Sequence, residues 1–284
     1  MQHIGLTRRQ FGLLASAVAA PYDGPALTAK QLVEHLKQNL GVAWRSPTVD
    51  TFKAGDPDTP VRGIATTFMA TLDVLQRAAA AERNLIITHE PTFYSHQDEI
   101  AALGSDPVFA AKRDFIAANR LVVFRFHDHL HARQPDFMFD GLAADLGWTD
   151  RRAEDQRFYK LPASTLGELA RHVQGRMTPR AMRVVGNPQL TVTRVAMSPG
   201  YTSFDAVQNL LARADVLIAG EMREWEGVEY TQDAVAAGMK KALILLGHQV
   251  SEEPGMRLCA EWLKTMFPKV PVDWVTTREP FWRP

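Results

Sequence analysis

The feature that most constrains the fold is an internal repeat, because each half of the chain carries the same alternation of strands and helices. Apolar runs predict strands at residues 61–65, 84–88, 121–126, 192–196, 216–219 and 242–246. Apolar residues at helical spacing predict helices between them, at residues 72–81, 107–119, 204–213 and 231–237. Since strand–helix–strand order gives mainly parallel sheets, the sequence predicts an α/β protein with two similar, duplicated lobes.

Aligning the two halves places polar side chains at equivalent strand ends. The aligned pairs are Glu90 with Glu221, His127 with His248, and His131 with Glu252. In parallel sheets, ligands bind beyond the carboxyl ends of the strands, and two lobes that face one another would bring these ends into one cleft. We therefore expect the functional site in the cleft between the lobes.

Two of the strand ends carry a histidine followed four residues later by another potential metal ligand. The pairs are His127 with His131 and His248 with Glu252. A spacing of four places both side chains on one face of a helix or turn, where they can share an ion. This pattern indicates a metal site built from imidazole and carboxylate groups.

Cysteine content narrows the choice of metal. Cys259 is the only cysteine in the chain, which excludes an internal disulfide and a site of several thiolates. Imidazole and carboxylate ligands suit zinc, iron, manganese or nickel. His89 and Glu90 follow another strand, and the enlarged set exceeds what one tetrahedral ion needs. Two divalent ions bridged by a carboxylate would use the whole set, and such a pair activates water as hydroxide.

The expected metal ligands are His89, Glu90, His131, His248 and Glu252. His127 is the candidate catalytic residue, acting either as a proton shuttle or as a sixth ligand. Other polar residues near these motifs have simpler explanations: Asp128 could orient an imidazole, and His129 faces the other way from its neighbours. We expect structural roles for His35, His96 and His172, and Glu221 has no assigned role.

The residues collected so far are similar to those of the Nif-three-like family of dinuclear-metal proteins, often described as type 2 GTP cyclohydrolase I. The similarity covers most of the chain. It rests on the Ile-Thr-His-x-Pro pattern at residues 87–91, on residues 127–131, and on the Gly-His-x-x-x-Glu pattern at residues 247–252. The resemblance implies an α/β fold with two similar lobes, a pair of metal ions in the cleft between them, and a homo-oligomer, commonly a ring-shaped hexamer.

The chain departs from the family pattern at two ligand positions. Glu90 stands where the family usually has a second histidine, and His131 stands where it usually has an aspartate. The two changes exchange an imidazole and a carboxylate, so the number of ligands is retained, which is what a functional site should show. Trp225 stands where many relatives carry a histidine or another polar residue, so we expect the substrate pocket to differ.

The N-terminus resembles an export signal. Paired arginines, Arg8 and Arg9, precede an uncharged stretch at residues 11–20 that ends in an Ala-x-Ala cleavage pattern. We expect residues 1–20 to be a twin-arginine signal, which places the protein in the periplasm or outside the cell. The alternative is an ordinary first helix of a cytoplasmic protein. Residues 21–152 are then the first lobe, 153–190 a connecting segment and 191–284 the second lobe.

Charge composition excludes several kinds of partner. Lysine plus arginine equals aspartate plus glutamate, 32 of each, so no net field favours nucleic acid, and no segment predicts a stable membrane anchor. The sequence predicts a metal-dependent hydrolase that acts on a small molecule. The alternative is a non-catalytic metal-binding or metal-delivery protein of the same fold.

Overall fold

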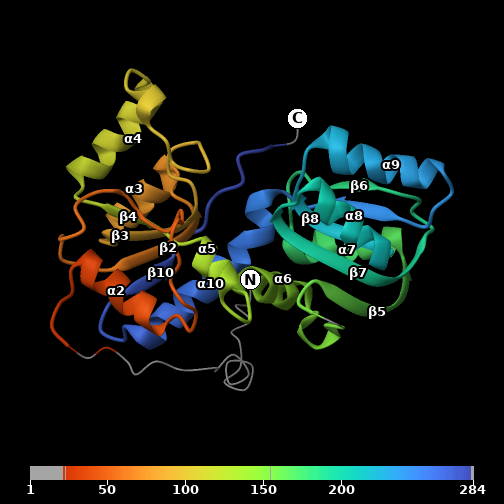
Figure 1. Ribbon diagram of the computed structural model, residues 1–284, viewed down its shortest axis with the longest axis horizontal. Coiled ribbons are helices and arrows are strands. Elements are labelled where there is room, and N and C mark those ends of the chain that lie inside the picture. The colour runs from red at the N-terminus through yellow and green to blue at the C-terminus, as the bar shows by residue number, and fades with distance from the viewer. Residues whose placement is uncertain (1–21, 23, 154, 283–284) are drawn as a thin grey trace.

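The described residues of this computed structural model, 22, 24–153 and 155–282, form two five-stranded sheets (Figure 1). The strand order of the first sheet is β1-β4-β3-β2-β10, with bounds β1 Phe52–Ala54, β4 Val122–Arg125, β3 Leu85–Glu90, β2 Ile64–Met69 and β10 Val272–Trp274. The second follows the order β5-β7-β8-β9-β6, with bounds β5 Phe158–Thr165, β7 Thr191–Tyr201, β8 Val216–Glu221, β9 Ala242–Leu245 and β6 Arg183–Val185.

The sheets confirm the predicted duplication. Three parallel strands, β2-β3-β4 in one lobe and β7-β8-β9 in the other, form the centre of each sheet, and an antiparallel strand borders β4 or β9. Five of these six strands, β2, β3, β4, β8 and β9, are almost completely buried because helices cover the faces of both sheets. The protein is therefore an α/β protein with two similar lobes, as the repeat predicts.

The helices divide each lobe into layers. In the first lobe α2 (Ala29–Asn39) packs on one face, while α3 (Leu72–Ala80) and α4 (Pro107–Ala118) pack on the other. In the second lobe α7 (Leu166–Met177) and α8 (Phe204–Arg213) cover opposite faces, and α9 (Glu229–Ala236) precedes β9. No helix in the described part of the chain combines the length and the apolar character that a membrane crossing requires.

A pair of helices between the lobes joins them. After β4 the short helix α5 (Asp128–Ala132) leads into α6 (Phe137–Leu146), and after β9 the chain enters α10 (His248–Met266), in the middle of the molecule (Figure 1). Apolar residues of α6 and α10 enter the cores of both lobes. These two helices thus fix how the lobes sit relative to one another.

Glycines allow α6 and α10 to approach closely. A Cβ atom added at Gly141 of α6 would lie 2.5 Å from the Pro254 carbonyl carbon and 2.6 Å from the Gly255 nitrogen. A Cβ atom at Gly255 of α10 would lie 2.3 Å from the Met138 sulfur and 2.9 Å from its Cα. Since real Cβ contacts are longer, the crossing requires that both positions lack a side chain.

Two segments of the chain belong to lobes to which the predicted domain boundaries do not assign them. Residues 153–190, expected to be a connection, supply β5, α7 and β6 to the second lobe, while β10 returns to the first sheet and pairs with β2. Glu253 of α10 explains this return, because its carboxylate accepts hydrogen bonds from the Trp274 indole (2.8 Å) and the Thr277 amide (3.1 Å). The expected export signal, residues 1–20, lies outside the described residues.

We expect Gly141→Ala to lower the free energy of unfolding by about 1–3 kcal/mol, because overpacking of a tight core contact has that effect. Chemical denaturation of the full chain measures it. The matched control is Gly175→Ala in α7, where nothing lies within 4 Å of an added Cβ. That change should raise stability by about 0.5–1 kcal/mol, since alanine is the better helix former. Equal effects of the two substitutions would contradict the close crossing.

Candidate metal centre

The six predicted site residues meet between the lobes, at the carboxyl ends of parallel strands. From the first lobe, β3 ends in His89 and Glu90, and β4 leads to His127 at the start of α5. His131 lies one turn further along α5. From the second lobe, β9 leads to His248, the first residue of α10, and Glu252 follows one turn later. The predicted position of the site, at the strand ends, agrees with this arrangement.

Two carboxylates lie among the imidazole groups. Glu252 places Oε2 3.1 Å from His248 Nε2 and 3.6 Å from His89 Nε2, and its Oε1 is 4.0 Å from His131 Nε2. Glu90 places Oε1 3.4 Å from His248 Nε2 and 3.5 Å from His127 Nε2. Each carboxylate therefore contacts more than one imidazole.

All four imidazoles are oriented through Nδ1, which leaves Nε2 directed toward the centre. The Nδ1 atoms of His127 and His131 lie 2.9 Å from a carboxylate oxygen of Asp128 and Asp136, respectively. The corresponding atoms of the other two, His89 and His248, lie 3.1 Å from the Phe126 carbonyl and from Glu221 Oε1. When Nδ1 carries the proton and donates to these oxygens, Nε2 presents a lone pair, which is how histidines that bind metals are usually held.

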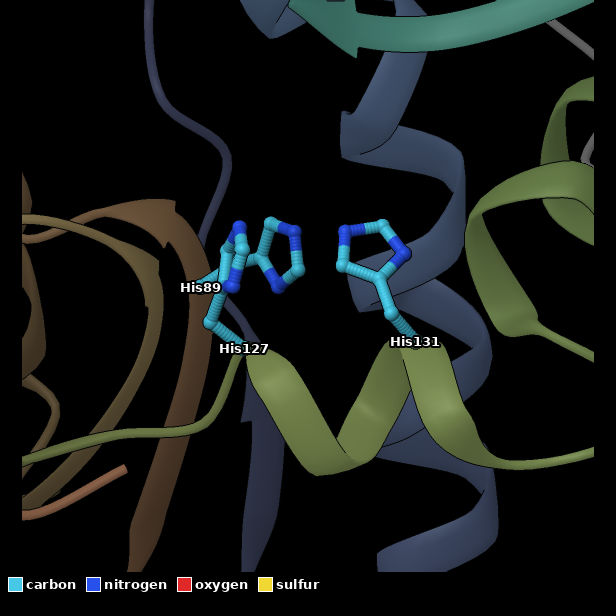
Figure 2. A group of neighbouring side chains, drawn as sticks. All are labelled: His89, His127 and His131. Atoms are coloured by element: carbon cyan, nitrogen blue, oxygen red, sulfur yellow. The ribbon is translucent and has the colours of Figure 1, made fainter. Parts of the chain in front are cut away.

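The site fits a metal ion on a further observation. His89 is completely buried, and its Nε2 has no hydrogen-bond partner among the described residues. Two groups in this part of the chain bring their ligand atoms within 4.8 Å of one another: His89 with His127 and His131, and His89 with Glu90 and Glu252. Figure 2 shows the first group, with the ring of His131 directed from α5 toward the other two rings. A cation bound at this point would supply the partner that this buried nitrogen lacks.

Charges in the cluster shift the protonation of its members. Burial opposes protonation of His248, but hydrogen bonds to Glu221, Glu252 and Glu90 outweigh it and raise its pKa to about 12. Burial likewise opposes protonation of His131, yet Asp136 and the two glutamates raise its pKa to about 9. Burial and neighbouring imidazoles lower the pKa values of His89 and His127. The carboxylates therefore attract positive charge to the centre.

Three positioning residues were missed from the sequence. Asp50 accepts hydrogen bonds from the amides of His127 (2.6 Å), Asp128 (3.0 Å) and His129 (2.9 Å), and so holds the start of α5. No local pattern connects it with residues 77 positions later. By contrast, the other two carry a signal. Arg125 is a charge within an apolar strand, and Asp136 stands where an N-cap precedes an apolar helix.

Arg125 contacts His89 and Glu90, the two residues that end β3 at the centre. Its side chain is fully buried, and it donates to the His89 carbonyl at 3.0 Å through Nε. Its Nη2 lies 3.3 Å from Glu90 Oε2. Because the guanidinium neutralises part of its charge, the buried Glu90 carboxylate stays ionised, and His248, His127 and Arg125 together lower its pKa to about 2 despite burial.

The remaining histidines differ in position. His129 faces away from the centre, as expected: its Nδ1 lies 2.7 Å from Asp50 and its ring stacks on Trp44 at 3.7 Å. His172 contacts the Leu146 carbonyl, and His35 packs between Tyr22 and Phe267, in agreement with structural roles. His96 lies in the wall of the cavity described next, with its ring 5.7 Å from that of His127. Cys259 is a buried core residue.

The centre opens into a cavity of about 1050 Å³ between the lobes. Residues of both lobes line it, among them Thr92, Tyr94 and Lys112 from the first and Ser198 and Tyr201 from the second. Trp225 is 74% exposed and is not among the lining residues, so it does not carry the pocket difference expected of it. The volume suits a small organic molecule in contact with the cluster.

The fold and the cluster define a two-lobed α/β protein whose His and Glu side chains could hold metal ions between the lobes. Comparison with known proteins agrees with this class. A profile of the Duf34/NIF3 (NGG1p interacting factor 3) family matches residues 27–280, so the chain belongs to that family. The resemblance to Nif-three-like proteins is thereby confirmed.

Individual relatives are distant. The chain is 23% identical over 241 residues to a Chlamydia pneumoniae protein named GTP cyclohydrolase 1 type 2 homolog, a match that covers 81% of this chain and 89% of that protein. A Bacillus cereus protein related to NIF3 superposes with a TM-score of 0.72 at 15% identity, over 91% of this chain and 99% of that one. A Staphylococcus aureus protein gives a TM-score of 0.70 at 18% identity, over 89% and 98%. The structural matches show a shared fold.

We expect Gly200→Ala to lower metal content measured on the purified protein, because an added Cβ would lie 2.2 Å from Glu252 Oε1 and 3.3 Å from His248 Nε2. Gly200 also has φ +73°, so alanine there adds backbone strain of about 1–2 kcal/mol. Gly147→Ala is the matched control, with φ +77° and open space around the Cβ position. It should lose similar stability and keep its metal. Equal metal content in both variants would contradict the close approach of Gly200 to Glu252.

Proposed function

We propose that the protein is a metal-dependent hydrolase whose centre holds two divalent ions and acts on a small molecule. The observation that supports this proposal most directly is the set of four Nε2 atoms and two carboxylates that converge beside the cavity. Two divalent ions held by these side chains would supply hydroxide from bound water at neutral pH, for attack on a carbonyl, imine or phosphoryl centre. No separate side-chain nucleophile is needed.

Some side chains of the centre would bind the ions, and others orient the imidazoles that do so. Glu252, which lies among three imidazoles, would be a central ligand of the ions. Asp128, Asp136 and Glu221 orient three of the imidazoles through Nδ1, and the Phe126 carbonyl orients the fourth. Such partners fix the ring orientation and strengthen the basicity of Nε2. The identity of the ions, among zinc, iron, manganese and nickel, is left to experiment.

For His127, the geometry favours the ligand role over the proton shuttle. His127 belongs to the same close group of potential ligands as His89 and His131, and its ring stacks on that of His89 at 4.6 Å. Its Nδ1 contacts the Asp128 carboxylate, just as the Nδ1 atoms of the other three histidines contact oxygen atoms of their own partners. His96, whose ring lies edge-on to His127 in the cavity wall, is better placed to exchange protons with solvent.

We expect protein purified without added metal to contain close to two divalent ions per chain, measured by elemental analysis. Glu252→Gln should lose at least one of them, since the amide removes the charge that three imidazoles face. Turnover of a panel of phosphoesters, amides and cyclic amidines should disappear with the metal. Glu261→Gln is the control: Glu261 lies on the same helix, α10, and pairs with Lys264 away from the centre.

The outcomes separate the candidate functions. Absence of metal from the wild-type protein would exclude the hydrolase and any metal-binding role. Two ions with no turnover of any substrate in the panel, together with rapid exchange of the ions, would favour a metal-delivery protein. Turnover that survives the loss of metal would contradict the hydroxide mechanism.

A further inference from the structure

A second polar group lines the cavity on its first-lobe side, apart from the metal centre. Thr92 follows β3 by two residues, and Lys112 lies on α4. Both line the cavity, as does Ser95 in the loop between them. None of these residues belongs to the ligand set, and all three offer hydrogen-bond donors.

The hydroxyl of Thr92 is buried without a partner. Thr92 has no solvent exposure, and its Oγ1 makes no hydrogen bond within the described part of the chain. A buried polar atom left unpaired destabilises a protein, so native structures seldom keep one unless water, an ion or a ligand satisfies it. The position beside the cavity indicates that the missing partner is a bound group.

The ammonium of Lys112 has donors to spare. Lys112 is 4% exposed, and within the described residues its Nζ donates one hydrogen bond, to the Thr92 carbonyl. The same Nζ lies 5.2 Å from the centre of the Tyr94 ring and 5.7 Å from that of Phe93. An ammonium carries three N–H groups and no acceptor, so it remains able to bind an anion.

The surrounding charges also favour an anion. Asp98 already faces Lys53 at 3.6 Å and Arg125 at 3.8 Å through its Oδ2. Arg125 is shared further with Glu90. Asp98 is therefore shared between Lys53 and Arg125, and within the described residues it makes no ion pair with the Lys112 ammonium.

We propose that Thr92, Ser95 and Lys112 form a subsite for an oxyanion group of the substrate, a phosphate or a carboxylate. The Lys112 ammonium supplies the charge, and the Thr92 and Ser95 hydroxyls donate hydrogen bonds to the oxyanion. The Ser95 oxygen already accepts from the Glu99 amide at 2.9 Å, which leaves its proton free to donate. The proposal deepens the proposed function, on which it rests: the substrate would be anchored here while its reacting bond faces the metal centre.

The test is the binding of inorganic phosphate, and separately of malonate, to the chelator-treated full-length protein, measured by calorimetry. We expect one of the two anions to bind, and the better one names the source of the oxyanion. Thr92→Val should weaken this binding about tenfold, the effect of one lost hydrogen bond to a charged group. Thr92→Val should not lower the midpoint of thermal unfolding, because it removes a buried hydroxyl that has no partner.

Thr231→Val is the matched control. Thr231 is equally buried, but its hydroxyl donates to the Gly227 carbonyl at 2.8 Å in the second lobe. This variant should unfold at a lower temperature and bind the anion like the wild type. Lys112→Met adds a second variant at the subsite, and it should abolish binding of the anion.

Three results would overturn the subsite. They are the absence of anion binding to the metal-free wild type, an affinity that Thr92→Val leaves unchanged, and binding that requires metal and ignores both variants. The last result would place the anion on the metal ions and leave the hydrolase proposal intact. A protein that binds the anion at Thr92 but never retains metal would instead support the subsite and contradict the proposed function.

Discussion

The rest of the structure depends on the close crossing of α6 and α10. The two helices meet where Gly141 faces the backbone of Pro254 and Gly255, so they approach without intervening side chains. α10 also delivers His248 and Glu252, while α6 follows directly from the short helix that carries His131. The spacing of the helices therefore sets the spacing of the imidazoles and carboxylates. A small displacement at the crossing would change the distances between the side chains of the cluster, because close-packed interiors transmit such shifts.

Much of the fold could be predicted from the sequence because the repeat is written in long, regular segments. Strands such as β3 and β8 begin with apolar runs, and α8 shows apolar residues at helical spacing over the predicted residues 204–213. The short strands β6 and β10 carry no such signal, since three residues are too few to show a period. Their sheet partners are decided by contacts distant in sequence, such as those of Glu253 with Trp274 and Thr277.

The predicted ligand set also meets in the structure, for a related reason. Residues that follow equivalent strands of a duplicated unit come to equivalent places, so the alignment of His127 with His248 and of His131 with Glu252 carried spatial information. The groups that orient them were harder to find. Asp50 and Gly200 act from loops and strand ends far away in sequence, and the role of Gly200 is visible only as the absence of a side chain beside Glu252. Spacing alone cannot reveal an absence of that kind.

The residues of the cluster come from both lobes, so the binding of a cation there would depend on how the lobes are arranged. His89, Glu90, His127 and His131 come from one lobe, and His248 comes from the strand end of the other. Any cation held there would bind to both lobes at once, so its binding free energy would stabilise the association of the lobes. Conversely, a motion that opens the cavity would draw on the same free energy. Binding of a cation at the centre and closure of the two lobes would therefore be thermodynamically coupled, each favouring the other.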